Sequence, residues 1–174
     1  MKKLLSFTLV ILALGFVGHA QKPFELGGEY AKSFGRGYNN NIVGLRGESF
    51  REKSSFSIGL TYHFSTSKSY SISKGFGMYA GYRYAFSDNV DGNSPFLGAR
   101  VLFSFENFEG KTSLNSLMMT PTAEVGYHFM FADNFYAAPA FGCGYTIKIT
   151  KEYNSLDEDE GLRFQPMVSA GYRF

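Results

Sequence analysis

Apolar and polar residues alternate along eight separate stretches of the chain, from residue 23 to its end. Alternation with a period of two is typical of β-strands whose two faces meet different surroundings. In the last stretch, Leu162 to Phe174, one face is almost wholly apolar and aromatic, whereas the other face carries Arg163 and Arg173. The pattern predicts strands at about residues 23–34, 41–50, 55–65, 75–86, 95–106, 118–131, 135–150 and 162–174.

The two faces of these predicted strands differ in the same sense throughout the chain. One face takes most of the aromatic side chains of a sequence with 19 Phe and 12 Tyr. The other face collects five acidic and six basic side chains: Glu25, Glu29, Glu48, Glu106, Glu124, Arg46, Arg83, Arg100, Lys148, Arg163 and Arg173. The apolar set is too large for one small core, so we predict that it faces lipid and that the charges face inward. The stretch 41–50 is the least clear, because Ile42 and Phe50 break its pattern.

Three of the predicted strands end in a repeated motif. The segments Gly81-Tyr82-Arg83-Tyr84, Gly126-Tyr127-His128-Phe129 and Gly171-Tyr172-Arg173-Phe174 share the form G-Y-x-aromatic and follow each other at intervals of 45 residues. This interval suits two strands with their connections, so the three motifs should lie at one rim of a sheet. Their outward Tyr and Phe side chains would form an aromatic girdle of the kind found at membrane interfaces.

The first 20 residues have the features of a secretory signal peptide. Lys2 and Lys3 form a basic start, residues 4–18 are apolar, and Gly18-His19-Ala20 is a small-x-small cleavage motif. The apolar run is shorter than the roughly 20 residues that a spanning helix requires. We therefore predict cleavage between Ala20 and Gln21, which leaves residues 21–174 as one mature domain.

Composition excludes several classes of function. Without Lys2 and Lys3 the 17 basic residues become 15, equal to the 15 acidic ones, and a neutral chain gives no reason to expect nucleic-acid binding. The single cysteine, Cys143, cannot form an intramolecular disulfide. No apolar run after residue 20 is long enough for a membrane helix. Because only helices and closed barrels satisfy the backbone in lipid, a membrane location requires a barrel.

The signal peptide, the eight stretches, the paired Asp-Asn turns and the terminal Tyr-x-Phe resemble the eight-stranded outer-membrane barrels of the OmpA/OmpX type, in the form common in Bacteroidota. The resemblance covers the mature chain and implies an all-β, antiparallel up-and-down transmembrane barrel (a meander) in the outer membrane. It implies that the barrel-assembly machinery recognises the last strand through Tyr172 and Phe174, although Ser169 stands where a glycine is expected. It also implies contact with outer-membrane lipid and lipopolysaccharide, a monomer without cofactor or metal, and outer loops that serve adhesion, host contact or envelope integrity.

Three other interpretations compete: a soluble sandwich or lipocalin-like barrel, a small pore, and a lipid A-modifying enzyme. Charges on one face of nearly every strand argue against the soluble protein. Eight strands enclose an interior that side chains fill, so an open channel is not expected. An enzyme could use His63 or His128, but both share the parity of the inward face, and no obvious Ser-His-acid set accompanies either of them. The acidic run at 157–160 lacks the spacing of an EF-hand.

The inward face also predicts specific ion pairs, because buried charges persist when they are paired. A connection centred between residues 37 and 38 places Glu29 opposite Arg46, and one centred on residue 112 places Arg100 opposite Glu124. Directly opposite side chains on antiparallel strands lie within salt-bridge reach. We therefore predict the pairs Glu29–Arg46 and Arg100–Glu124 inside the barrel, joined into one network with Tyr79.

Overall fold

The computed structural model describes residues 23–35, 39–64, 71–87, 92–109, 114–132, 134–150 and 160–174. The predicted signal peptide and its cleavage site at Ala20 and Gln21 lie outside these ranges, as do residues 157–159 of the acidic run. Every regular element in the described ranges is a strand. A search of the same ranges finds no helix that is long and apolar enough to cross a membrane.

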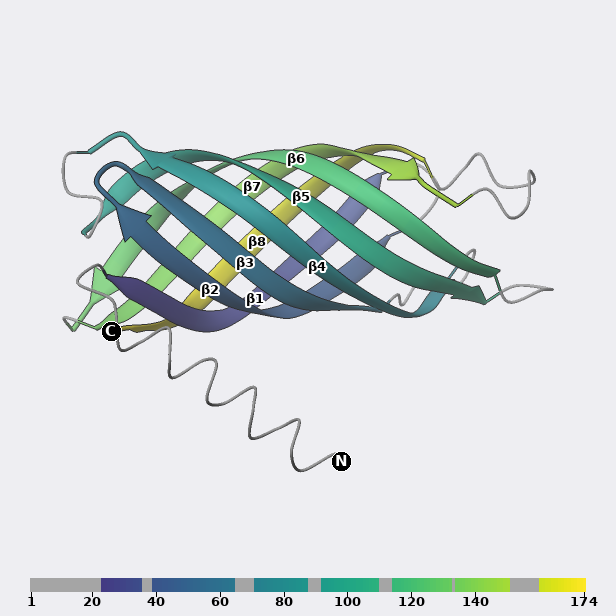
Figure 1. The fold of residues 1–174 in the computed structure, drawn as a ribbon, viewed down its shortest axis with the longest axis horizontal. Coiled ribbons are helices and arrows are strands. Elements are labelled where there is room, and N and C mark those ends of the chain that lie inside the picture. The colour runs from purple at the N-terminus through teal and green to yellow at the C-terminus, as the bar shows by residue number, and fades with distance from the viewer. Residues whose placement is uncertain are drawn as a thin grey trace, which may run out of the picture.

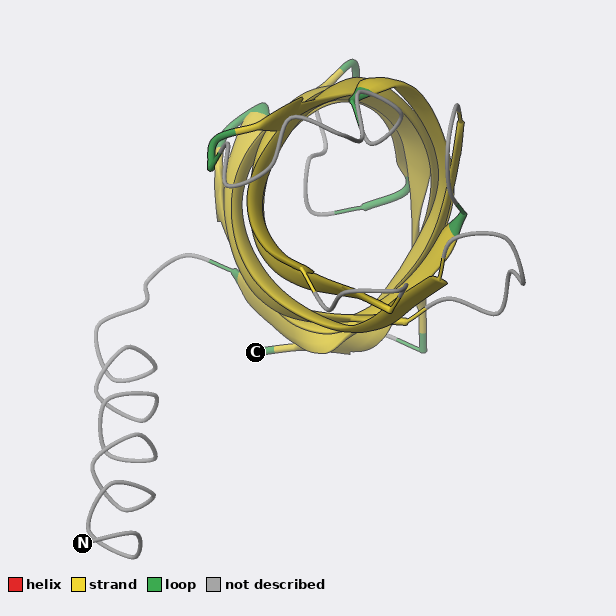
Figure 2. Cartoon of the chain, turned by 90° about the vertical axis from the view of Figure 1, so that its right-hand side faces the viewer, coloured by secondary structure: helices red, strands yellow, loops and turns green. Residues whose placement is uncertain are grey.

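Eight strands form one closed antiparallel barrel (Figure 1). They are β1 (Phe24–Gly35), β2 (Asn40–Arg51), β3 (Ser54–Phe64), β4 (Ser71–Ala85), β5 (Ser94–Glu109), β6 (Leu114–Phe131), β7 (Phe135–Lys148) and β8 (Gly161–Arg173). Each strand pairs with its neighbours in the sequence, and β8 pairs with β1 to close the ring, as the view along the axis shows (Figure 2). The predicted fold class, an all-β meander barrel, is confirmed.

The strand ends agree with the alternation to within a few residues. The largest differences lie at the rim opposite the C-terminus, where β4, β5 and β6 extend three or four residues beyond their predicted ends. The added segments (SISK, NFE and LNSL) mix polar and apolar residues, so the two faces lose their contrast there. Hydrogen bonding continues past the point at which the pattern stops.

The two exceptions in β2 turn out to have packing roles. Ile42 and Phe50 are only 4% and 5% exposed and face the interior. Phe50 lies under the guanidinium of Arg173, whose Cζ is 4.8 Å from the ring centroid. Ile42 belongs to an apolar cluster with Ala31, Tyr79, Leu102 and Met167. Apolar side chains thus fill the interior between its charged groups.

The barrel has the inverse polarity of a soluble protein. Of the eleven charged side chains predicted to face inward, ten are buried and Lys148 is partly exposed. Large apolar side chains cover the outside instead, and Leu45 and Phe105, for example, are each 66% exposed. Exposed apolar surface of this extent marks a contact with a membrane or a partner.

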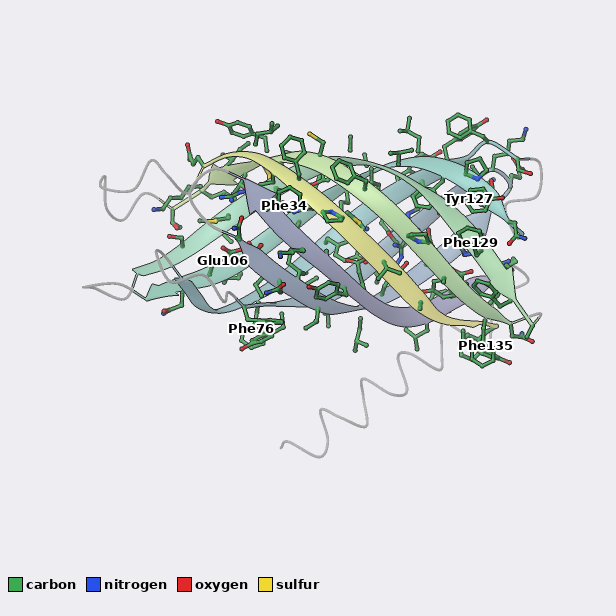
Figure 3. All side chains as sticks on the ribbon, turned by 180° about the vertical axis from the view of Figure 1, so that it is seen from behind. Phe34, Phe76, Glu106, Tyr127, Phe129 and Phe135 are labelled. Atoms are coloured by element: carbon green, nitrogen blue, oxygen red, sulfur yellow. The ribbon has the colours of Figure 1, made fainter. Side chains whose placement is uncertain are left out.

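Aromatic side chains gather near both ends of the outer surface. Tyr127, Phe129 and Phe135 lie near the C-terminal rim, and Phe34 and Phe76 lie near the opposite rim (Figure 3). The rings of Tyr127 and Phe129 are 4.5 Å apart, in the girdle that the repeated motif predicts. The band at the opposite rim lies outside the repeat, and the motif therefore gave no sign of it.

The predicted strand registers are wrong by two residues. Glu29 lies opposite Gly44 rather than Arg46, and Arg100 lies opposite Thr122 rather than Glu124. Hairpin register is fixed by the geometry of the connection, which alternation does not report. A shift of two residues keeps every side chain on its face, so the predicted partners become diagonal neighbours, still within reach of long side chains.

Candidate functional site

Three clusters along the barrel axis contain the buried acid–base and histidine contacts of the described interior. The central charge ring consists of Glu29 of β1, Arg46 and Glu48 of β2, Arg83 of β4, Arg100 of β5 and Glu124 of β6. The closure cluster, at the C-terminal rim, consists of Glu25, Phe50, His128, Tyr136 and Arg173. The glycine-floored cluster, toward the opposite rim, consists of Asn40, Thr61, His63, Gly75, Gly77, Ser104 and Glu106.

Acids and bases alternate around the central charge ring, and each contacts two groups of opposite charge. The shortest N–O distances are 3.6 Å for Glu29–Arg46, 2.6 Å for Arg46–Glu48, 3.5 Å for Glu48–Arg83, 2.7 Å for Arg83–Glu124, 2.8 Å for Glu124–Arg100 and 2.7 Å for Arg100–Glu29. The last contact closes the cycle across the interior. Three carboxylates and three guanidiniums cancel, so the ring as a whole is neutral.

Tyr79 of β4 packs against this ring from inside the barrel. Its hydroxyl donates a hydrogen bond to Glu29 Oε2 at 3.1 Å, and the guanidinium of Arg100 lies 4.5 Å from the centroid of its ring. Gly59 lies opposite Tyr79 on β3. A Cβ at Gly59 would lie 2.2 Å from Tyr79 Cε1, so the glycine provides the space that the aromatic ring occupies.

The structure brings all four predicted pair residues, with Tyr79, into the central charge ring. Glu29 and Arg46 make its longest contact, at 3.6 Å, and Arg100 contacts Glu29 as well as Glu124. Glu48 and Arg83 also belong to the network, although their inward parity alone did not predict this. Parity shows which charged side chains face inward, but it does not show which of them contact each other. The contacts depend on the strand registers, which were predicted incorrectly.

Every carboxylate oxygen of the central charge ring has a partner. Glu48 Oε1, for example, accepts a hydrogen bond from Ser55, and its Oε2 contacts Arg46 and Arg83. Removing one partner of a buried ion pair typically costs about 3–5 kcal/mol, because a charge is left without compensation. The arrangement suits a structural role that fixes strand positions and fills the interior.

The closure cluster joins the first strand to the last. Glu25 and Arg173 lie directly opposite each other on β1 and β8, and Arg173 Nη2 is 2.6 Å from Glu25 Oε1. His128 of β6 donates from Nε2 to the same oxygen at 2.9 Å. The imidazole stacks on Tyr136 with 5.5 Å between ring centroids. One carboxylate therefore holds three strands together at this rim.

The predicted assembly signal is exposed beside the closure cluster. Tyr172 and Phe174 are 39% and 59% exposed on the outer surface, and their ring centroids are 5.1 Å apart. The backbone N–H of Phe174 donates to the carbonyl of Phe24 at 2.8 Å, so β1 holds the end of the chain in place. Both aromatic side chains are accessible from outside the barrel.

His63 has a hydroxyl and a carboxylate as partners. Its Nδ1 is 2.9 Å from Glu106 Oε1, and its Nε2 is 2.9 Å from Thr61 Oγ1. No obvious Ser-His-acid set was expected at His63, and the structure places a threonine hydroxyl and a carboxylate beside it. The acid was missed because it comes from β5, on the far side of β4 from the histidine. All three side chains are buried inside the barrel.

Comparison of the sequence with protein-family models and with curated proteins gives no match. Solved structures match over most of the chain. For the N-terminal β-barrel domain of Pseudomonas aeruginosa OprF the TM-score is 0.62 at 14% identity, over 88% of this chain and 100% of that one. For Neisserial surface protein A (NspA) the TM-score is 0.62 at 14% identity, over 88% of this chain and 96% of that one. For Ail of Yersinia pestis, in complex with the heparin analogue sucrose octasulfate, the TM-score is 0.52 at 16% identity, over 89% of this chain and 100% of that one.

Identities this low establish the fold alone. All three similar structures are barrels of outer-membrane or surface proteins, and each is covered almost from end to end. The chain therefore has the closed, eight-stranded fold of small outer-membrane barrels.

Proposed function

We propose that this protein is an integral outer-membrane barrel with a filled interior, which acts as a structural or interaction protein through the connections that it displays outside the cell. The inverted polarity carries this proposal, since charged side chains are buried inside and large apolar side chains cover the outside. Exposing apolar surface to water costs about 25 cal/mol per Å². A lipid bilayer removes this cost, and the two aromatic bands suit its two interfaces.

The C-terminal rim faces the periplasm in this proposal. The connections at this rim are 52–53, 86–93 and 132–134, whereas the opposite rim carries 36–39, 65–70, 110–113 and 149–160. The two shortest lie at the C-terminal rim and the longest at the opposite rim, although 86–93 is longer than this pattern predicts. Short periplasmic turns and longer extracellular loops are usual in bacterial barrels. The signal peptide, the role of Tyr172 and Phe174 in assembly and an origin in Bacteroidota stay predictions.

A small pore is the first rival function. The central charge ring crosses the interior and would have to open before ions could pass. We expect no steady conductance when the purified protein is inserted into a planar lipid bilayer. A reproducible conductance in the nanosiemens range would replace the closed barrel with a channel.

A lipid A-modifying enzyme is the second rival. His63 has a hydroxyl and a carboxylate beside it, but this set faces the interior, whereas acyl chains contact the outer surface of a barrel. We expect no acyl release from lipid A by the purified protein. Release that disappears in the His63→Ala variant, but not in His128→Ala, would establish the enzyme.

Location and partner binding need separate experiments. Cell fractionation should place the protein, cleaved after Ala20, with the outer membrane and its lipopolysaccharide. Retention of Met1, or recovery in the soluble fraction, would contradict the proposal. To find the role of the outer connections, residues 65–70 and 151–159 can be replaced by Gly/Ser linkers of equal length. Binding of whole cells to host cells or glycans should decrease in this variant, while barrel assembly stays normal.

A further inference from the structure

The glycine-floored cluster is built from two parallel rows of residues across three neighbouring strands. Directly opposite residues place His63, Gly75 and Glu106 in one row. The second row consists of Thr61, Gly77 and Ser104. In both rows the middle strand, β4, contributes glycine, so side chains from β3 and β5 can meet above its bare backbone. A Cβ on Gly75 would lie 3.0 Å from His63 Cβ and 3.2 Å from Glu106 Cγ, so a side chain at this position would crowd both neighbours.

Two buried oxygen atoms in this cluster have no hydrogen-bond partner among the described residues. Glu106 Oε1 contacts His63 Nδ1 and the Ser104 hydroxyl, both at 2.9 Å, whereas Glu106 Oε2 contacts no donor. Asn40 Oδ1 is also buried and unpartnered. Glu106 and Asn40 are each at least nine-tenths buried. Buried acceptors without partners are costly, so each suggests a ligand that the described residues do not supply.

The contacts of His63 Nδ1 are also in conflict. This nitrogen is 2.9 Å from an acceptor, Glu106 Oε1, and 3.5 Å from a donor, Asn40 Nδ2. A proton on Nδ1 satisfies the glutamate, but the nitrogen then cannot accept a hydrogen bond from the N–H group of the asparagine. Turning the amide over brings Asn40 Oδ1 toward the same nitrogen and adds another acceptor. In the structure Glu106 Oε2 and Asn40 Oδ1 have no donor, and a cation would serve both of these oxygens together with Nδ1.

We propose that the glycine-floored cluster binds a divalent transition-metal ion of the Zn²⁺ type through His63 Nδ1, the Glu106 carboxylate and Asn40 Oδ1. Zn²⁺ is bound in proteins by imidazole nitrogen and carboxylate oxygen. Metal binding releases the proton of Nδ1 to solvent. Thr61 Oγ1, at 2.9 Å from Nε2, holds the imidazole in the required orientation.

The site has fewer ligands than a dedicated zinc cage. The described residues hold no group of three His, Cys, Asp or Glu side chains that could bind a metal ion. The amide oxygen therefore serves as the third protein ligand, and water completes the coordination. Figure 3 shows Glu106 toward the rim opposite the C-terminus, from which an ion would enter.

The closure cluster provides a matched comparison within the same barrel. It contains a second buried histidine–glutamate pair, His128 and Glu25, with the same 2.9 Å separation. There, however, Arg173 Nη2 lies 2.6 Å from the shared carboxylate oxygen. The guanidinium already supplies the positive charge and repels a metal ion. Two histidines in similar pairs are therefore expected to differ in metal binding.

Zn²⁺ titration by calorimetry tests this proposal, using protein purified from outer membranes in detergent and stripped with EDTA. We expect one saturable site per chain. The isosteric change Glu106→Gln should weaken the apparent affinity at least about tenfold. His63→Asn should remove the site, and Asn40→Asp, which adds a carboxylate, should strengthen binding. His128→Asn should bind as the unaltered protein does.

The gel mobility of each unboiled variant shows whether the barrel has folded, and only folded variants are compared. Absence of saturable binding in the unaltered protein would mean that the orphan oxygens merely bind water, and it would overturn the proposal. So would equal affinities for the unaltered protein and Glu106→Gln. A loss of binding in His128→Asn as large as that in His63→Asn would show non-specific histidine coordination. Unchanged affinity in Asn40→Asp would remove Asn40 from the ligand set.

Discussion

Replacing Glu124 by Gln removes one negative charge from the central charge ring while almost preserving the shape of the side chain. Its carboxylate accepts charge-assisted hydrogen bonds from Arg83 Nε at 2.7 Å and from Arg100 Nε at 2.8 Å. After the change, two buried guanidiniums lose a carboxylate partner. The ring, neutral before, then carries one net positive charge in a space from which water is largely excluded.

The expected cost follows from this burial. Glu124 is 3% exposed, and removing one partner of a buried ion pair typically costs about 3–5 kcal/mol. The change Arg100→Met alone should cost a similar amount, because it strips a partner from Glu29 and Glu124 at once. The double variant keeps two acids and two bases and is neutral again. Its cost should therefore be about 1–3 kcal/mol less than the sum of the single costs.

Urea unfolding in lipid vesicles measures these free energies. The chain has no Trp, so the folded fraction is better followed by the faster gel mobility of the unboiled barrel than by fluorescence. Arg51→Met is the matched control, because Arg51 is exposed and its replacement should change stability by less than about 0.5 kcal/mol. Additive costs in the double variant, or a cost for Glu124→Gln no larger than that of the control, would refute the ring as a coupled unit.

Exchanging the two charges gives a sharper result still. If Arg100 and Glu124 formed an isolated pair, the double change Arg100→Glu with Glu124→Arg would restore it. In the ring the new arginine would face Arg83, and the new glutamate would face Glu29. We therefore expect the exchanged variant to stay about as unstable as the worse single variant. Recovery to near the stability of the unaltered protein would mean that the pair acts alone.

Three further changes test other parts of the structure. Leu45→Arg, in the middle of β2 on the outer face, should lower the free energy of unfolding in lipid by about 2–4 kcal/mol, whereas Leu45→Ala should lower it much less. Equal losses for the two variants in a urea titration would argue against a lipid-facing surface. Gly59→Ala should lower stability by displacing the ring of Tyr79, and Gly59→Ala with Tyr79→Leu should recover part of the loss in the same titration. Phe174→Ala keeps the backbone hydrogen bonds of β8. It should reduce the amount of barrel assembled in cells, whereas refolding from urea should be unchanged. Normal cellular levels would show that the terminal aromatic is not the assembly signal.

Alternation was sufficient to find the strands, because a period of two is imposed by the backbone and by the contrast between lipid and interior. It found the buried charges for the same reason. It could not find the partner of each charge. The partner depends on register, which the connections determine, and a shift by two residues leaves the alternation unchanged. Glu29 and Arg46 still meet at 3.6 Å only because an arginine is long enough to reach a diagonal neighbour.

The glycine-floored cluster was missed for a different reason. Its histidine and its glutamate come from β3 and β5, which are not neighbours, and the strand between them contributes Gly75 and Gly77. Glycine adds nothing to a pattern of apolar and polar positions. The cluster has a sequence signature of its own. Two inward-facing polar residues on one strand and two on the next strand but one lie on either side of two inward-facing glycines on the strand between them. The sequence contains it as T-x-H, G-x-G and S-x-E in three consecutive strands.

The contact between Glu25 and Arg173 has a consequence for how the barrel is completed. These residues are 148 positions apart, yet they lie directly opposite each other where β1 meets β8. Their alignment depends on the sum of the register shifts in all seven hairpins that join β1 to β8. The same sum determines the tilt of the strands and the diameter of a closed barrel. A slip in any one hairpin therefore displaces the two ends, unless a second slip compensates for it. The pairing of β1 with β8 therefore depends on the register of the whole chain. Glu25 lies opposite Arg173 only when every strand has paired correctly.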